Sequence, residues 1–583
     1  MNIRPLLLAL AATPTAAIAV NFNWNGNNAD WSAAAEWTPA GPPSGGAGNF
    51  AYVAGGIANI TSNTAAQDAF AIQDTFVRGT GTINQTGGTH AVTGWNFIGD
   101  QAGNNATYTI ANATANAARW YAGRAGGTGT LNVGSGATVT GTDGGQGFII
   151  GEGAGSVGVL NVTGGTLSST AEFWAGQGVG GNGTVNHSSG TVNVGNWMAI
   201  GRDQSIGAYT LSGDAILNKT GANHIVVGSL GGQGTLTQTG GTMNVSNDIR
   251  LGEDTAGIAG NGFVDFQGGT STSVGNIIIG WLGTGTTNRT NISGTAIVTA
   301  ANVLVGDATA GALNLNGGTL RVNTIADAAG GGVPQVNFNG TSVVALSDQA
   351  EFLPGLNTAE TEVQGGGIRI DTNTFSIGIG AGLDGVGGLT KTGAGTLTLS
   401  GANTYAGLTT ISSGTLVVIG SVSGNINIAN GATLAGNGTV GSVAVAEGAT
   451  LAPGTSPGTL SVGNLGLLSS TTLAYELATP GIVGSNVNDL ISVTGNLTLD
   501  GTLQITPLAG FGNGSYRIFD YTGSLTNNGL SLQPGFLASY PGSAIDTSIA
   551  NQVNLTVVPE PTAAVSALAG LGLLFGTRRR RSA

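Results

Sequence analysis

The residues best suited to acid–base chemistry are carboxylates and arginines that follow a recurring glycine. Carboxylates placed beside arginine are the groups with which polysaccharide lyases and glycosidases cleave sugar chains. Two such groups stand out: Asp100, Arg124 and Glu152, and then Arg202, Glu253 and Asp254. Opposite charges at this spacing can also pair between successive repeats. We expect a ladder of ion pairs here, with a catalytic carboxylate pair as the alternative.

Other kinds of reaction centre find little support in the sequence. The chain has no cysteine, which excludes disulfides and thiolate chemistry. Its histidines fall in different repeats, without zinc-ligand spacing or a serine nucleophile motif. They are His90, His187 and His224. Turns similar to the calcium repeat G-G-x-G-x-D carry Leu131, Val185 or Leu236 in place of the aspartate. We therefore expect no catalytic residue, no metal and no cofactor.

Charge and composition limit the partners. The chain has 583 residues, 106 of them glycine, and a formal net charge of −13. Setting aside Arg4 and the four arginines near the C-terminus leaves 11 basic against 29 acidic residues, or −18. Such a body repels phosphate backbones, so nucleic acid is not an expected partner.

Glycine marks a repeat along the chain. A phrase of the form apolar-x-apolar-Gly recurs at intervals of 24 to 28 residues. We call its glycines the anchor glycines: Gly99, Gly123, Gly151, Gly176, Gly201, Gly228, Gly252, Gly280 and Gly306. Two further short β-type segments follow each phrase, and three strands in about 26 residues make one turn of a β-helix. A propeller blade would need about 40–50 residues. The repeat predicts an all-β parallel β-helix with turns of about 25 residues.

The positions before each anchor glycine predict which side chains face the core. Residues one and three before the glycine are almost all apolar, so we expect them to point into the helix. The residue two before it should point outward, yet this row is also apolar and includes Phe97, Tyr121 and Trp174. An apolar outer row indicates a surface that is covered or that binds a partner. These three rings are candidates for stacking on sugars, although packing against a loop or a neighbouring layer is the interpretation we favour.

The N-terminus has the pattern of an export signal. Arg4 precedes an apolar run at residues 6–12, and Ala-Ile-Ala at 17–19 fits a cleavage site. We expect residues 1–19 to be a signal peptide.

The C-terminus combines three parts in a fixed order. Pro559, Glu560 and Pro561 precede a 16-residue apolar run at 562–577. The run is followed by Arg578, Arg579, Arg580 and Arg581. A short apolar helix backed by arginines acts as a stop-transfer anchor, with the arginines kept cytoplasmic.

This order closely resembles the PEP-CTERM sorting signal of Gram-negative bacteria. The resemblance implies that Pro559, Glu560 and Pro561 are read by an exosortase-type processing enzyme, and that the chain is tethered to the inner membrane before processing. A membrane-anchored C-terminus without processing is the alternative. The resemblance covers residues 557–583.

A second resemblance lies in the body of the chain. Residues 388–407, GLTKTGAGTLTLSGANTYAG, and the segment 430–462 closely resemble the autotransporter-associated β-strand repeat of bacterial passenger domains. This implies a right-handed parallel β-helix belonging to a secreted surface protein, in agreement with the turns expected from the glycines.

Together these features divide the chain into six expected regions. They are a signal peptide (1–19), an N-terminal cap with the first strands (20–75), a β-helix with the repeat marked by the anchor glycines (76–325), a β-helix with the autotransporter-associated repeat (326–465), terminal β-rich turns (466–556) and the sorting and anchor segment (557–583).

We expect an exported structural or adhesive β-solenoid of a Gram-negative-type bacterium. After a membrane-tethered stage it would reach the cell surface, exopolysaccharide or biofilm matrix, with polysaccharide as a candidate partner. The alternative is a β-helix polysaccharide lyase or glycosidase.

Overall fold

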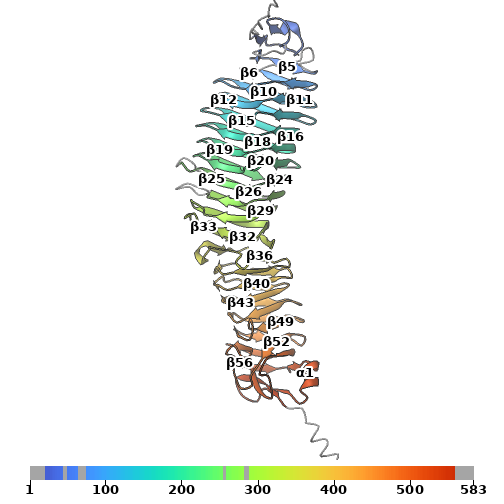
Figure 1. Cartoon of the computed structure of the whole chain (residues 1–583), viewed down its shortest axis with the longest axis vertical. Helices are drawn as coiled ribbons and strands as arrows, with labels where there is room; N and C mark the ends of the chain where they lie inside the picture. Colours follow the sequence, from blue (N-terminus) through green and yellow to red (C-terminus); the bar gives the residue numbers. More distant parts are fainter. Residues whose placement is uncertain (1–19, 44–48, 63–73, 254–257, 281–287, 559–583) are drawn as a thin grey trace, which may run out of the picture. The chain divides into compact units, whose positions relative to one another are not determined.

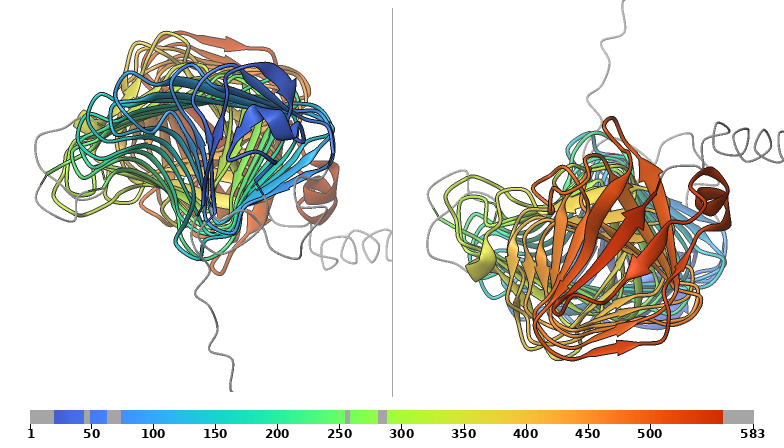
Figure 2. Two further views of the ribbon diagram at one scale, coloured as in Figure 1. Left: turned by 90° about the horizontal axis from the view of Figure 1, so that it is seen from above. Right: turned by 90° about the horizontal axis from the view of Figure 1, so that it is seen from below.

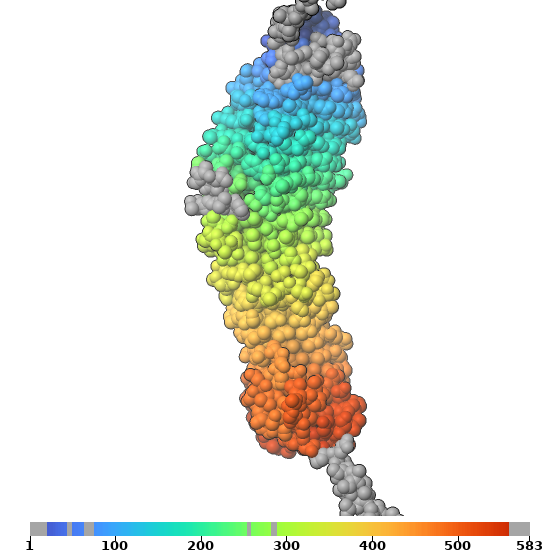
Figure 3. Space-filling view, viewed as in Figure 1, coloured from blue at the N-terminus to red at the C-terminus, as the bar shows by residue number. Residues whose placement is uncertain are grey.

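The computed structural model describes residues 20–43, 49–62, 74–253, 258–280 and 288–558. They form two compact units. Of the described residues, unit 1 comprises those up to Asp265 together with Gly269–Ser271, and unit 2 comprises Phe266–Gly268, Thr272–Gly280 and residues 288–558. Both units are right-handed β-solenoids, and their described residues make about 19 turns in all. Within each unit the turns form successive layers in sequence order (Figures 1 and 3).

In unit 1 each turn places one strand in a first sheet, sheet A, and two segments in a second, sheet B (Figure 2). The strands of sheet A are β1 (Asn21–Trp24), β3 (Trp37–Thr38), β4 (Phe50–Val53), β6 (Asp74–Val77), β9 (Trp95–Ile98), β12 (Arg119–Arg124), β15 (Gln146–Glu152), β17 (Glu172–Gln177), β19 (Met198–Arg202), β22 (Ile225–Ser229) and β25 (Ile249–Glu253). Apart from β3, each pairs in parallel with the strand of the next turn, as in Trp120↔Phe148.

Sheet B of unit 1 has up to two strands in each turn. These are β2 (Asn28–Asp30), β5 (Ile57–Ile60), β7 (Thr82–Gln85), β8 (Thr89–Ala91), β10 (Asn105–Ile110), β11 (Thr114–Ala117), β13 (Thr128–Val133), β14 (Thr138–Gly141), β16 (Val157–Ser169), β18 (Asn182–Val194), β20 (Ile206–Leu211), β21 (Ile216–Lys219), β23 (Gln233–Gln238) and β24 (Thr242–Val245). β16 and β18 run through both positions as single strands of 13 residues. Pairs such as Val157↔Asn182 and Asn182↔Ile206 have the spacing of the anchor glycines, so the repeat predicted from the sequence is confirmed.

The inward rows predicted from the sequence form the core. One residue before the anchor glycine, Ile98, Ile150 and Val227 are at most 1% exposed. Three residues before it, Trp120 and Phe173 are fully buried. The anchor glycine turns the chain sharply behind this core: at Gly123 the φ angle is +69°, and a Cβ atom would lie 2.2 Å from the carbonyl oxygen of Val157. Glycine is required here for both reasons.

An antiparallel strand ends sheet A near the N-terminus. β3 pairs antiparallel with β1 after a short 3-10 helix, η1 (Ala34–Glu36). Trp24, Trp31 and Trp37 are buried here, and the ring centroids of Trp24 and Trp31 lie 5.0 and 4.7 Å from that of Trp37. The strand therefore covers an edge that would otherwise be open to pairing with another chain.

Unit 2 is also built mainly from parallel strands. Its first strands are β28 (Ile277–Ile279), β29 (Asn288–Thr299), β30 (Asn302–Val305), β31 (Gly311–Val322), β32 (Thr324–Asp327), β33 (Pro334–Phe338), β34 (Ser342–Ala345), β35 (Thr361–Val363) and β36 (Ile368–Asp371). Two further strands, β26 (Asn261–Phe266) and β27 (Thr270–Ser273), contain residues of both units. A short 3-10 helix, η2 (Thr358–Glu360), precedes β35.

From β36 onward each turn of unit 2 contributes strands to three sheets. The first contains β38 (Asp384–Gly385), β39 (Leu389–Thr392), β42 (Thr409–Ile411), β45 (Ile426–Ile428), β48 (Val443–Val445), β51 (Leu465–Gly466), β54 (Leu497–Leu499) and β57 (Leu525–Asn527).

The other two are sheets C and D. Sheet C contains β37 (Ser376–Ile379), β40 (Thr396–Leu399), β43 (Thr415–Val418), β46 (Thr433–Gly436), β49 (Thr450–Pro453), β52 (Thr472–Leu477), β55 (Thr502–Pro507) and β58 (Ser531–Leu532). Sheet D contains β41 (Ala402–Asn403), β44 (Ser421–Val422), β47 (Thr439–Val440), β50 (Thr459–Val462), β53 (Leu490–Val493), β56 (Gly514–Tyr521), β60 (Gln552–Val557) and β59 (Ala544–Asp546).

The turn length predicted from the anchor glycines is too long for part of unit 2. Leu389 pairs with Thr409, and Thr409 pairs with Ile426, so both turns are shorter than the interval between any two anchor glycines. The turns are shorter because the corners between their strands contain fewer residues. For example, only two residues separate β40 from β41.

The described chain ends in antiparallel strands. β60 pairs antiparallel with β56 and β59, and the helix α1 (Pro534–Ser539) precedes β59 and β60. Among the described residues, no helix has the length and hydropathy needed to cross a membrane. The signal peptide at 1–19, the motif Pro559, Glu560 and Pro561, and the arginines at 578–581 lie outside the described residues.

Candidate binding face on sheet A

The outward side of sheet A in unit 1 carries a column of mainly aromatic side chains, which we call the ring column. Its members follow one another in register: Tyr52, Phe76, Phe97, Tyr121, Ile149, Trp174 and Ala199. The rings of Tyr52, Phe76, Phe97 and Tyr121 are parallel within 10°, with centroids 4.7, 4.7 and 5.0 Å apart. These separations match the ~4.8 Å between paired strands, so β-pairing itself positions the stack.

Arginine side chains cover the ring column. The guanidinium carbon of Arg78 lies 4.6 Å from the ring centroid of Phe76, and that of Arg124 lies 4.9 Å from Tyr121. Further along, Arg202 lies 4.7 Å from Trp174 and 5.2 Å from the ring of Trp197. Such cation–π contacts let the guanidinium groups seal an apolar surface while keeping their N–H groups available.

This cover buries the three candidate sugar-stacking residues. Phe97, Tyr121 and Trp174 are 4%, 3% and 9% exposed. The ring faces of Phe97 and Tyr121 contact each other, and all three residues contact arginines. The outer row is therefore packed against a layer of arginines, and direct stacking of sugars on these rings stays a prediction.

Ion pairs join successive turns beside the ring column. Arg78 makes two hydrogen bonds of 2.7 Å to the carboxylate of Asp100, and this contact raises the pKa of Arg78. One turn further, Arg124 donates to Glu152 over 2.7 Å. We call this the ion ladder. Of the first charged group, Arg124 and Glu152 pair as expected, whereas Asp100 binds Arg78, a residue that the sequence analysis did not single out. Its carboxylates are already bound to guanidinium groups.

The second charged group is only partly assembled. Arg202 pairs in register with Ser229, and Ser229 with Glu253, so Arg202 and Glu253 are two turns apart. Arg202 instead donates to the side-chain oxygen of Gln177 over 2.9 Å. Burial raises the pKa of Glu253, an effect that Arg250 and Arg202 oppose. Asp254 lies outside the described residues.

Several groups on this face were not singled out from the sequence. Arg119 binds Asp143 over 2.6 Å and also donates to the hydroxyl of Tyr121. Burial raises the pKa of Glu172, which shares this face. The position of Arg119 beside the apolar outer row is the feature of the sequence that could have identified it. Asp143 could not be found in this way, because it lies in a turn outside the repeat phrase.

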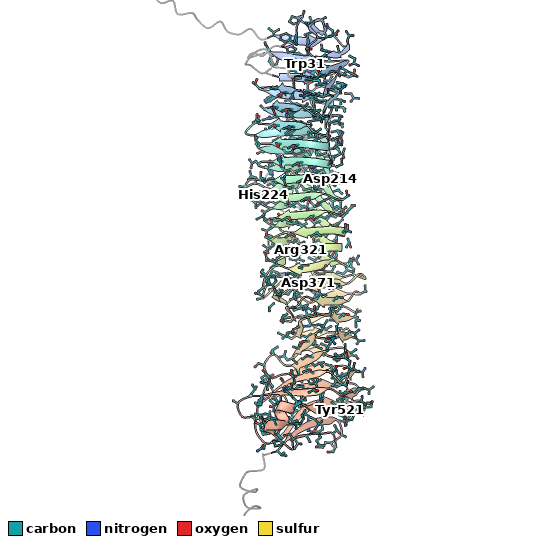
Figure 4. All side chains as sticks on the ribbon, turned by 90° about the vertical axis from the view of Figure 1, so that its right-hand side faces the viewer. Trp31, Asp214, His224, Arg321, Asp371 and Tyr521 are labelled. Carbon is teal, nitrogen blue, oxygen red and sulfur yellow. The ribbon has the colours of Figure 1, made fainter. Side chains whose placement is uncertain are left out.

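A histidine and a fourth arginine–carboxylate pair continue the face. His224 lies 3.4 Å from Asp248, which Arg250 also binds at 2.8 Å. Burial lowers the pKa of His224, and the charge of Arg250 adds to this. His224 can be located in Figure 4. Thus all five arginines among the described residues of unit 1 lie on the outer face of sheet A.

The arrangement is suited to binding more than to catalysis. Asp100 and Glu152 are separated by the turn that carries Arg124, which places them about 10 Å apart at ~4.8 Å for each turn. In the part of the chain that the structure describes, no group of three histidines or carboxylates is placed to hold a metal ion.

Comparison with known proteins identifies one repeat family and two relatives. The family described as Passenger-associated-transport-repeat matches residues 389–418, which confirms the resemblance to autotransporter-associated repeats in that segment. The chain is 50% identical over 95 residues to the adhesin BmaC autotransporter of Brucella suis biovar 1 (strain 1330), covering 16% of this chain and 3% of that protein. It is 56% identical over 46 residues to an extracellular serine protease of Serratia marcescens, covering 8% and 4%. The matches thus span a small fraction of either relative.

Proposed function

We propose that this protein is a secreted, surface-displayed β-solenoid with a structural or adhesive role, and that the outer face of sheet A contacts polysaccharide. The observation that carries the proposal is the gathering of all five described arginines of unit 1 on the face that holds the ring column. The repeat family and the relative named as an adhesin support it. The match to the protease covers 4% of that protein, which is too little to argue for proteolysis.

The hydrogen-bonding capacity of the face supports a sugar ligand. Each guanidinium has five N–H donors. The ion pair of Arg124 to Glu152 uses one of them, and the Arg124 side chain is 39% exposed. Sugar hydroxyl and carboxylate oxygens can accept from the remaining N–H groups, while sugar hydroxyls can donate to the carboxylates. Donors and acceptors recur at ~4.8 Å from turn to turn. A ligand that is itself a repeating polymer can therefore contact the face at several successive turns.

The route to the cell surface belongs to the same proposal. Residues 1–19 would direct export, and the segment 557–583 would tether the protein to the inner membrane until an exosortase-type enzyme acts at Pro559, Glu560 and Pro561. The protein would then reside in the envelope, the exopolysaccharide or a biofilm matrix.

A panel of acidic and neutral polysaccharides tests the binding role. Retention of the full chain on a glycan without its depolymerisation is the expected result. Arg124→Gln should weaken retention about tenfold, because one charged hydrogen bond contributes about 1.5 kcal/mol. Arg517→Gln is the matched control, since Arg517 forms a partly exposed ion pair with Asp520 in unit 2. Equal loss in both variants, or no retention by the unaltered chain, would refute the assignment to sheet A.

A polysaccharide-cleaving enzyme is the second candidate, favoured by the raised pKa values of Glu172 and Glu253. Raised carboxyl pKa values are typical of general acids. However, β17 and β25 are three turns apart, about 14 Å along the stack. Glycosidase carboxylates lie about 5 to 9.5 Å apart. Depolymerisation that is lost in Glu152→Gln or Arg202→Gln would establish the enzyme in place of the binding role.

A further inference from the structure

The outward side of sheet B in unit 1 is a neutral array of hydroxyl and amide groups, which we call the Thr/Asn face. One column in register across β11, β14, β16, β18, β21 and β24 is Thr114, Thr138, Thr166, Thr191, Ile216 and Thr242. A second column, across β10, β13, β16, β18, β20 and β23, is Thr109, Asn132, Asn161, Asn186, Thr210 and Thr237.

Two more columns adjoin these and begin at Thr107 and Asn116. Together they carry hydroxyl and amide groups, and the column that begins at Thr107 also contains the apolar residues Val159 and Ala208. In β16 and β18 a single strand carries members of all four columns, so the columns belong to one sheet.

Hydrogen bonds between turns fix the amide groups of the face. Asn161 donates to the side-chain oxygen of Asn132 over 2.8 Å, and Asn186 donates to Asn161 over 2.9 Å. Asn218 and Asn244 extend a parallel series with bonds of 3.0 and 2.9 Å. Each amide in such a series still has a second N–H and a second lone pair. Threonine adds a hydroxyl on a stiff, β-branched side chain. The array therefore presents ordered donors and acceptors with little conformational entropy left to lose on binding.

The face carries almost no charge, in contrast to sheet A of the same turns. Its strands between residue 105 and residue 245 contain no exposed ionisable side chain, and Asp214 lies in the corner between β20 and β21. Lys219 and His187 point inward and are 1% exposed. Figure 4 shows Asp214 and His224, which belong to the two different faces, on opposite sides of the ribbon at a similar level.

The dimensions of the array suit a crystalline partner. Side chains recur at ~4.8 Å between turns and at about 6.7 Å between alternate residues of a strand. Six turns of strands up to 13 residues long present on the order of 1,000 Å², more than the ~800 Å² that each partner buries in a standard stable interface. Hydrogen-bonding groups thus repeat in two directions on this face, as they do on the surface of a crystalline solid.

We propose that the Thr/Asn face binds ice. An ice surface is neutral, and its water molecules donate and accept hydrogen bonds at positions that repeat in two directions, which is the chemistry that the face presents. A crystalline neutral polysaccharide shares the hydroxyl chemistry but is bound better through aromatic platforms. The tyrosines of these strands, Tyr108 and Tyr209, are fully buried in the core. The inference goes beyond the proposed function, because it concerns a different sheet and a different partner.

Partition into growing ice tests the proposal. The full chain, fluorescently labelled, is frozen slowly, and its concentration in the ice is compared with that in the remaining liquid. We expect enrichment in ice, and a loss of about tenfold in Thr191→Lys, which places a charged side chain at the centre of the array. Thr191→Val removes the hydroxyl while keeping shape and β-propensity, and should lower the enrichment without affecting the fold. Thr410→Lys, on the half-exposed side of β42 in unit 2, is the matched control.

Three results would overturn the proposal. The first is an unaltered chain that stays in the liquid, and the second is entry of both Thr191 variants into ice to the same extent as the unaltered chain. The third is sedimentation with microcrystalline cellulose that is lost in Thr191→Lys, without enrichment in ice, which would assign the face to a polysaccharide instead. None of these results bears on Arg124 and sheet A, so the two proposals fail separately.

Discussion

A buried lysine in unit 2 gives the sharpest test of how the turns hold together. Lys391 is fully buried, and its ammonium group donates to the hydroxyl of Thr372 and to the carbonyl oxygens of Thr392, Gly393 and Ser413 over 2.9 to 3.1 Å. These oxygens belong to three successive turns, so the ammonium joins the turns at one corner. Lys391→Met keeps the stem of the side chain and removes the donor.

The magnitude follows from two opposing effects. The ammonium group has three N–H donors, which these four acceptors share, so three full hydrogen bonds contribute about 4.5 kcal/mol at ~1.5 kcal/mol each. Burial lowers the pKa of Lys391 from 10.5 to about 8, which corresponds to a penalty of roughly 3 kcal/mol for the charged form. The substitution removes both effects, so the net loss is about 1.5 kcal/mol. Thr392 and Gly393 keep other donors, from Thr372 and Ser413, and this prevents a larger loss.

Native-state hydrogen exchange measures this loss locally, which suits a solenoid whose turns can open independently. Amides of β39 and β42 should exchange about tenfold faster in Lys391→Met, as expected for ~1.5 kcal/mol. Thr390→Met is the control, because Thr390 is the neighbouring, partly exposed residue on the same strand. If the amide exchange rates of Lys391→Met equal those of the control, the ammonium group does not stabilise the contacts between these turns.

The same lysine predicts how stability depends on pH. Its pKa is about 8 in the fold and 10.5 in the unfolded chain, so between these values the unfolded chain binds the proton that the folded chain has released. The free energy of unfolding must then rise with pH across this window. Lys219, whose pKa burial also lowers to about 8, contributes in the same direction. The rise in unit 2 should vanish in Lys391→Met while that of unit 1 remains.

Three further substitutions probe the corners of the turns. Gly123→Ala should destabilise unit 1 by about 3 kcal/mol or more, because its Cβ would lie 2.2 Å from the carbonyl oxygen of Val157. Gly103→Ala is the control: Gly103 also has a positive φ but open space around it, so this change should cost about 1 kcal/mol. Equal thermal unfolding midpoints for the two variants would contradict this prediction. Asp489 accepts hydrogen bonds from the backbone N–H groups of Gly458 and Glu476, and burial raises its pKa to about 6. Because the folded chain holds this proton longer, stability should fall as pH rises from 3.8 to about 6, and Asp489→Asn should remove that slope in thermal unfolding between about pH 4 and 7.

The sequence predicted the turns well because one residue type marks them. The anchor glycines sit where a side chain would collide with the next turn, so their spacing reports the repeat directly, as at Gly123. The inward rows followed from alternation along the strand. The shorter turns of unit 2 did not follow, because their length is set at the corners and not in the strands that were aligned.

The outer row shows what alternation alone cannot predict. Its position placed Phe97 and Tyr121 outward, and they are outward, but they are buried. Their cover comes from arginines such as Arg124, which lies beyond the anchor glycine and bends back over the row. That depends on side-chain conformation. Lys391, in contrast, could have been found, since alternation from the buried Leu389 places it on the inward side.

The solenoid distributes its chemistry along columns, and this has a consequence for how function can be lost. A residue such as Asn161 interacts mainly with one partner in the turn before and one in the turn after. Replacing it interrupts one step and leaves the rest of the column in place. A binding face built in this way should lose affinity in proportion to the number of interrupted steps, because distant sites add independently. A reaction centre behaves differently, since removing one of its few groups abolishes nearly all activity. The experiment adds Arg78→Gln, Arg124→Gln and Arg202→Gln to sheet A successively, so that each variant carries one more substitution than the last. Glycan retention should therefore fall in steps. A complete loss at the first substitution would show that the face works as a single site.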